Sequence, residues 1–327
     1  MKRLLMALLF VGLMFVYTLA YECDDSRYSA LAPISVMGDH LHHKKEAMVS
    51  YRLMTMTMDQ NQSARTKQSV SDVLSSYMVA PLEMTMRMHM LGVMFAPDDR
   101  FTLMMMLPYV TKSMSHRKRD LSEFTRQSQG LGDTRISALI GVMNREFSSM
   151  HLNVGLGLPT GSIDETDGQP VRLPYPMQLG SGSYDLHLGS TFNRSIRGST
   201  LGGQLSTVLR LGKNKHGYAL GNTYAVQGWY AYFLSDSLSV SLRSKLAGWG
   251  DIRGRDSDLN PAMVPSAETD RAGSQLDLGL GVAYSFVTGQ FKGSRLGLEL
   301  TGPVYQRFDS VQLASNWGVT LGWQYAR

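Results

Sequence analysis

Methionine is the residue type whose number and spacing could support metal chemistry in this sequence. The chain has 327 residues and 22 methionines, and 15 of these lie between Met37 and Met114. Several alternate with other residues, as in MTMTM at residues 54–58. A thioether is a soft ligand that suits Cu(I), whereas methionine also serves as a flexible apolar side chain that fills gaps. The sequence therefore leaves two interpretations open, a soft-metal path and ordinary packing.

Histidines add a second group of possible ligands near the N-terminus. His40, His42 and His43 lie in the segment 21–45, which has no clear periodicity. Imidazole is a common ligand of transition metals. A copper site built from this segment and the residues that follow it would use Met37, His40, His42, Met48, Met54 and Met56. The alternative is a solvated polar linker without bound metal.

Motifs of common catalytic sites are not found in the chain. The sequence has no G-x-S-x-G, no H-E-x-x-H and no phosphate-binding loop of P-loop form. Its single cysteine, Cys23, excludes an internal disulfide framework. A net charge of +5 is too mild to indicate a nucleic-acid partner. We therefore expect a non-catalytic protein without a required cofactor.

Extended segments with two different faces must position these side chains. In residues 275–286 the even positions are leucine, valine or aromatic residues, and the odd positions are glycine, alanine or polar residues. This alternation predicts strands with one apolar face. Twelve such strands are expected, at 46–58, 82–95, 101–114, 133–144, 149–158, 183–194, 199–212, 221–234, 237–249, 274–287, 294–304 and 316–326.

The connections between these strands alternate between short turns and longer segments. The longer ones are expected at 59–81, 115–132, 159–182, 213–220, 250–273 and 305–315. This pattern with an even strand number is typical of bacterial outer-membrane barrels, in which closure satisfies every backbone hydrogen bond. A soluble β-sandwich would also alternate, but it does not account for the loop pattern. The predicted fold class is all-β, a transmembrane antiparallel up-and-down barrel of about twelve strands.

The N-terminus indicates export. Lys2 and Arg3 precede an apolar run that ends at the small residue Ala20, the arrangement of a signal peptide. An uncleaved anchor is the alternative, although the run is short for a membrane span. The expected organisation is a signal peptide at 1–20, a periplasmic or plug segment at 21–45 and a barrel at 46–327. The expected location is the outer membrane, where lipid and lipopolysaccharide surround the chain.

The two faces of each strand predict which side chains line the lumen. An arginine at the lipid midplane costs about 2–4 kcal/mol, so charged residues are expected inside. This argument places Glu83, Arg87 and His89 in the lumen and the methionines of 84–90 against lipid, which would divide the methionine cluster. The predicted lumen and selectivity residues are Arg52, Glu83, Arg87, His89, Asp133, Arg135, His151, Asp185, His187, Arg210, Arg243, Lys245, Asp277 and Glu299.

Six stretches of the chain carry a resemblance to a known family. They are APISVMGDHLHHKKEAMVSYRLM at 32–54, LPTGSIDETD at 158–167, LPYPMQLGSGSYDL at 173–186, LNPAMVP at 259–265, and PVYQ at 303–306 before GWQY at 322–325. The chain resembles the outer-membrane β-barrel family labelled transporter or "putative MetA-pathway of phenol degradation". The resemblance implies an outer-membrane barrel and the uptake or efflux of small molecules, some of them aromatic. It transfers no catalytic or binding residue.

Three functions follow from these observations. The first is a channel or transporter for small solutes whose lumen charges select by charge and hydrogen bonding. The second is a methionine- and histidine-rich barrel that binds or passes soft metal ions such as copper. The third is a closed structural or adhesive barrel that acts through its long loops. Conductance separates the first from the third, and metal titration separates the second.

Overall fold

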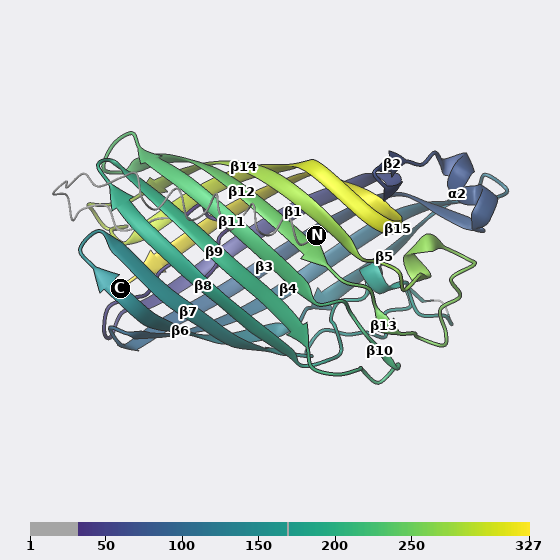
Figure 1. Ribbon diagram of the computed structural model, residues 1–327, viewed down its shortest axis with the longest axis horizontal. Coiled ribbons are helices and arrows are strands. Elements are labelled where there is room, and N and C mark those ends of the chain that lie inside the picture. Colours follow the sequence, from purple (N-terminus) through teal and green to yellow (C-terminus); the bar gives the residue numbers. More distant parts are fainter. Residues whose placement is uncertain (1–31, 169) are drawn as a thin grey trace, which may run out of the picture.

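The chain forms one closed sheet of long antiparallel strands. The computed structural model describes residues 32–168 and 170–327, so the expected signal peptide at 1–20 lies outside the described residues. Strands that follow one another along the chain pair in the sheet, and the last strand pairs with the first, which closes the barrel (Figure 1). The barrel strands are β1 (Ala47–Ala64), β3 (Val79–Asp98), β4 (Phe101–Lys118), β6 (Thr134–Arg145), β7 (Ser148–Leu158), β8 (Asp185–Ile196), β9 (Ser199–Arg210), β11 (Thr223–Phe233), β12 (Leu238–Trp249), β14 (Gly273–Ser285) and β15 (Ser294–Ala326).

Strand β15 contributes two arms to the barrel. Residues 295–308 pair with β14 and residues 308–326 pair with β1, both antiparallel. The arms contact each other, because Gln306 Nε2 donates to the Ser315 carbonyl oxygen at 2.9 Å. A ring of eleven strands cannot close with every neighbour antiparallel, so β15 must reverse its direction. The barrel therefore has the even number of spans that the sequence predicts.

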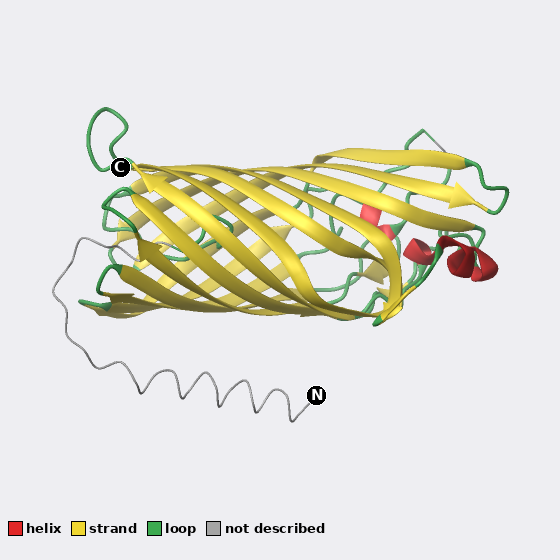
Figure 2. Cartoon of the chain, turned by 90° about the horizontal axis from the view of Figure 1, so that it is seen from above, coloured by secondary structure: helices red, strands yellow, loops and turns green. Residues whose placement is uncertain are grey.

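The two ends of the barrel differ in their connections. One end has the short connections 99–100, 146–147, 197–198, 234–237 and 286–293. The other end has the longer connections and the small elements, with the helical segments gathered there (Figure 2). These small elements are β2 (Thr66–Lys67), α2 (Val70–Ser76), β5 (Glu123–Leu131), η1 (Tyr175–Met177), β10 (Tyr218–Ala219), β13 (Arg253–Gly254) and η2 (Pro265–Ala267). No helix in the described ranges is both long and apolar enough to span a bilayer.

Two segments predicted as loops are strands instead. Residues 115–132 form the end of β4, a turn at 119–122 and β5, which pairs with β4. Residues 305–315 lie within β15. The prediction failed because the apolar alternation stops there, where both faces carry serine, threonine and charged residues, while the backbone pairing continues. Strands of 18 to 20 residues, as in β1, β3 and β4, are also longer than the roughly 9–11 residues that cross a bilayer.

The outer surface of the barrel has a belt of exposed apolar side chains. On β14, Leu278 and Leu280 are 43% and 66% exposed, and Leu300 on β15 is 55% exposed. On β3 the belt includes Leu91 and Phe95. An apolar outer belt over a polar interior is the surface expected of a barrel that faces lipid. The sheet therefore has an outer face that is apolar along this belt, as the alternation in the sequence predicts.

A charge placed on this belt should destabilise the barrel. Leu280→Arg is expected to lower the free energy of unfolding by about 2–4 kcal/mol in lipid vesicles, since the guanidinium would lie in hydrocarbon. Ser113→Arg is the control, because Ser113 also faces outward but lies beyond the belt. The urea midpoint of each variant measures the effect. An equal loss in both variants would contradict a lipid-facing belt.

Candidate functional site: a lumen crossed by an N-terminal segment

Residues 32–42 lie inside the barrel, and the exposed residues 43–45 follow them before β1 begins. We call residues 32–45 the lumen segment. Ala32, Val36 and Asp39 are 1%, 2% and 5% exposed. A chain without regular secondary structure must satisfy its backbone groups by other partners when it is buried. Inward-facing side chains of the strands supply these partners, as the following contacts show.

Strands from opposite parts of the sequence hold the backbone of the lumen segment. Arg52 Nε of β1 donates to the Ile34 carbonyl oxygen at 2.8 Å, and Arg295 Nη2 of β15 donates to that of Ala32 at 2.7 Å. Asn193 Nδ2 of β8 donates to the Asp39 carbonyl oxygen at 2.6 Å.

Two further strands complete these contacts. Gln204 Nε2 of β9 donates to the Met37 carbonyl oxygen at 3.1 Å, and His151 Nε2 of β7 lies 2.9 Å from that of Gly38. Because β1, β7, β8, β9 and β15 all contribute, the segment crosses the lumen rather than following one wall.

Glycines in the wall allow the lumen segment to approach closely. A Cβ atom on Gly297 of β15 would lie 2.8 Å from Ile34 Cβ, which is shorter than real Cβ contacts. Gly322, in the second arm of β15, has Ile34 as its nearest neighbour as well. Gly38 of the segment has φ of 61°, a left-handed conformation that glycine adopts without strain. The fit therefore depends on the absence of side chains at these positions.

One buried ion pair joins the wall to the lumen segment. Arg243 Nε of β12 donates to Glu299 Oε1 of β15 at 2.7 Å, and the two side chains are 8% and 0% exposed. The other oxygen, Glu299 Oε2, accepts from Ser35 Oγ at 2.5 Å and from Ser35 N at 3.3 Å. Both carboxylate oxygens of Glu299 are thus used, one by the barrel and one by the segment.

Other predicted lumen residues also face inward and form local pairs. Asp185 and Arg210 form an ion pair between β8 and β9. Arg135 Nε donates to Ser137 Oγ at 2.9 Å, and Lys245 and Asp277 are cross-strand partners on β12 and β14. His187 lies on the same inner face as Asp185. Asp133 accepts hydrogen bonds from backbone N–H groups of the 159–184 connection, at Gly161 and Ser181.

Three residues predicted to lie in the lumen face outward instead. Glu83, Arg87 and His89 are exposed on β3, and the hydroxyl of Tyr51 lies 2.7 Å from His89 Nδ1 on the outer surface. The prediction assumed that these positions lie within the lipid. They lie towards the loop end of a 20-residue strand, where outward charges meet water and need no place in the lumen.

The prediction that the methionines of β3 face lipid is wrong for the same reason. Met84 and Met90 are 3% and 8% exposed, so the methionine side of β3 faces the lumen. The same holds for β1 and for β4 except for Met105, so the methionine cluster is not divided between lumen and lipid. The sequence argument missed this arrangement because it assigned each strand to the bilayer over its whole length.

The predicted metal set is brought only partly together. Met37, Met48 and Met54 belong to one apolar cluster. His40 and His42 instead contact each other, with ring centroids 4.8 Å apart. Their Nδ1 atoms lie 3.0 Å from a carboxylate oxygen of Asp39 and 3.3 Å from one of Glu46, respectively. Met56 contacts Ser315, with 3.9 Å between Sδ and Oγ.

Several lumen residues were missing from the sequence prediction. Arg295, Asn193 and Gln204 all bind the lumen segment. Arg295 has the same parity on its strand as Glu299, which was predicted to face inward, so this signal was present. Asn193 and Gln204 are neutral and give no comparable signal.

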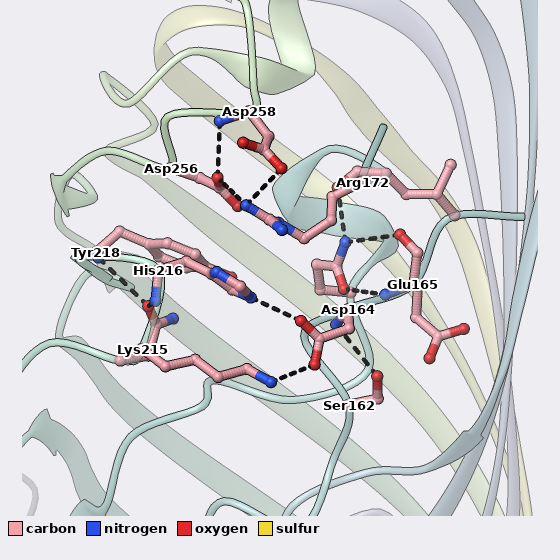
Figure 3. A network of polar contacts seen from close by, with 12 residues as sticks. Ser162, Asp164, Glu165, Arg172, Lys215, His216, Tyr218, Asp256 and Asp258 are labelled. Atoms are coloured by element: carbon pink, nitrogen blue, oxygen red, sulfur yellow. Dashed lines mark hydrogen bonds and ion pairs between the residues drawn. The ribbon is translucent and has the colours of Figure 1, made fainter. Parts of the chain in front are cut away.

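The connections at the loop end are joined by a network of charges (Figure 3). Arg172 donates to Asp256 at 2.7 Å and 2.8 Å, and its Nη2 lies 2.9 Å from Asp258 Oδ2. Asp164 contacts Lys215 and His216. The network ties the 159–184 connection to 211–222 and 250–272.

Two carboxylates of this network have lowered pKa values. Hydrogen bonds from Lys215 and His216 hold the pKa of Asp164 below its ordinary value. Burial raises the pKa of Asp256, but hydrogen bonds from Arg172 and Asp258 N outweigh burial and lower it.

Removing Arg172 should release the 159–184 connection. Arg172→Ala is expected to raise chymotrypsin cleavage there by about tenfold or more, because charge-assisted hydrogen bonds contribute about 1.5–3 kcal/mol. Lys215→Ala is the control, since its pair is largely exposed and worth less than about 1 kcal/mol. Equal cleavage in the two variants would contradict this role.

The stabilisation that this network provides should depend on pH. Because the pKa values of Asp164 and Asp256 are lowered in the folded chain, their contribution is present above about pH 4 and should be lost as the pH falls below that value.

Comparison with known proteins found similarities in structure and in sequence. An outer membrane channel from Pseudomonas putida F1 is 14% identical, with a TM-score of 0.62, covering 89% of this chain and 99% of that one. The transport unit of the autotransporter AIDA-I from Escherichia coli is 10% identical, with a TM-score of 0.49, covering 89% and 93%. No curated protein matches the chain. A family model described as "Putative MetA-pathway of phenol degradation" matches residues 89–315, and the chain belongs to this family.

Proposed function

We propose that the protein lies in the outer membrane and passes small solutes through its lumen without catalysing a reaction. The outer apolar belt supports this location, because such a surface requires a lipid or detergent environment. The family description names phenol degradation, so small aromatic molecules are one class of solute to test. The lumen segment would act as the gate of this channel.

The observation that carries the proposal is the way in which the lumen is blocked. The strands' own side chains do not fill the barrel at this level, because a separate segment crosses it and accepts hydrogen bonds from β1, β8, β9 and β15. A segment that lies outside the sheet can move without breaking the pairing of the strands. A purely structural barrel has no need for such a removable obstruction.

The inward charges would select among the solutes that pass. Arg135, Arg210, Lys245, Asp185 and Asp277 all face the lumen. Charged rings and polar constrictions select by electrostatics and hydrogen bonding in other channels. Mixed signs favour polar or aromatic solutes of low net charge over strongly charged ones.

Single-channel recording in planar bilayers tests the proposed channel. The experiment compares the intact chain with a variant that lacks residues 32–43, and the variant is expected to carry the larger current. A closed structural or adhesive barrel would give no current in either form.

A further inference from the structure

The inner wall formed by β1, β3 and β4 has a continuous methionine surface. We call it the methionine face, and it comprises Met48, Met54, Met56, Met58, Met84, Met86, Met88, Met90, Met94, Met104, Met106 and Met114. The three strands are neighbours in the barrel (Figure 1). Their pairing places many of these side chains directly opposite one another across the sheet.

A small cavity lies where the methionine face meets the lumen segment. Its lining includes five methionines, Met37, Met48, Met94, Met104 and Met106. Met94 on β3 is the cross-strand partner of both Met48 on β1 and Met104 on β4, and directly opposed side chains have Cβ atoms about 4.5–5.5 Å apart. Four of the five are less than 9% exposed, and Met37 comes from the segment itself. Methionines from four separate pieces of chain therefore line one small cavity.

Further methionine pairs continue from this cavity towards the loop end. Met54 faces Met88 and Met56 faces Met86 in the register of β1 and β3. Successive rows on one face of a strand are about 6.6–6.8 Å apart. The rows end in a second cluster that includes Met58, Met84, Met114 and Met177. Sulfur atoms are thus available at short intervals over the length of the wall.

Packing alone does not account for the choice of methionine. Leucine and valine are common at the apolar positions on the outer belt, and the inner positions of β7 to β9 are mainly glycine and polar residues. Methionine is concentrated on the inner side of three strands, whereas only Met105 of these strands faces lipid. Neutral thioethers give little stabilisation to hard cations but are good ligands for Cu(I) and similar soft ions. Arg52 and Asp39, which also line the cavity, carry opposite charges, so a cation there does not meet a net positive wall.

We propose that the methionine face binds a soft monovalent cation, Cu(I) or Ag(I), in the cavity lined by Met37, Met48, Met94, Met104 and Met106. The methionine pairs between the two clusters provide successive thioether ligands along the wall. This inference goes beyond the passage of small solutes and does not depend on it, because the cavity exists with the lumen segment in place.

Titration with Ag(I) tests the proposal without a redox step. Silver nitrate is added to the folded mature chain in detergent and chloride-free buffer, and binding is followed by calorimetry. The triple variant Met48→Leu/Met94→Leu/Met104→Leu is expected to lose about tenfold or more in affinity, as changes at metal sites commonly do. Leucine nearly conserves the volume of methionine, so the core is retained. Met105→Leu is the matched control and should bind as the wild type does.

A second measurement uses the unaltered protein. With the methionine methyl groups labelled with ¹³C, Ag(I) should shift the signals of the cavity methionines first, at a ratio of about one ion per chain. The signal of Met105 should not move. Single Met→Leu changes assign the signals, so the result stands even if the triple variant fails to fold. The proposal is overturned if the triple variant binds Ag(I) as tightly as Met105→Leu, or if the exposed Met78 and Met263 shift before the cavity methionines.

Discussion

Deletion of residues 32–43 is expected to raise the single-channel conductance by on the order of tenfold or more, because a twelve-stranded lumen lies between filled eight-stranded barrels and open porins. The lumen segment crosses the barrel and is the obstruction at that level. Its removal exposes Arg52, Arg295 and Glu299 to water in the lumen rather than to lipid. The barrel should therefore remain folded, which heat-modifiable mobility on gels can check.

A single substitution in the wall tests whether displacing the lumen segment, rather than deleting it, opens the channel. Gly297→Ala places a Cβ 2.8 Å from Ile34 Cβ and should increase the open probability of the intact chain. Gly302→Ala is the matched control on the same strand, because its Cβ would meet nothing closer than 3.9 Å. An unchanged current in both the deletion and the Gly297→Ala variant would argue against a channel gated by this segment.

The second large effect is expected at Glu299. Glu299→Ala should lower the free energy of unfolding by about 3–5 kcal/mol, since it leaves the buried guanidinium of Arg243 without its partner. The same change removes the acceptor of Ser35, so the lumen segment should also be held less firmly. Urea unfolding of the barrel in lipid vesicles measures the first effect, and conductance measures the second.

Two variants show whether the loss comes from the unpaired charge. Arg243→Met/Glu299→Met replaces both partners by apolar side chains and should recover most of the stability, as it does at many buried pairs. Glu83→Ala removes an exposed carboxylate on the outer surface and should change stability little. A loss at Glu83 as large as that at Glu299 would contradict the importance of the buried pair.

Much of this fold was predictable from side-chain alternation. The β14 stretch of leucines at even positions correctly predicted an outward apolar face, and the twelve spans follow from counting such stretches. Arg243, Asp277 and Glu299 were placed correctly on the inner face for the same reason. Alternation predicts the inner face here because these strands lie within the apolar belt over most of their length. Outward positions there are apolar, and charged side chains face inward.

Side-chain alternation predicted the wrong face where a strand extends beyond the apolar belt. Arg87 and His89 are exposed on β3 on the loop side of the belt residues Leu91 and Phe95, so their polarity gives no information about the inner face. A single sequence does not mark the height at which the belt ends. The contacts of Arg172 with Asp256 and of Asn193 with Asp39 could not be predicted either, because each joins residues more than 80 positions apart and involves at least one irregular segment.

The closure of the barrel by residues 308–326 constrains how the molecule can be assembled. Met48 pairs with Ala326, so the seam between β1 and β15 can form only once this arm of β15 is available to pair with β1. The lumen segment immediately precedes β1 and lies directly beside that seam. The simplest order of assembly is therefore one in which the lumen segment takes its place before β15 pairs with β1. The barrel would then close around a segment that is already inside it.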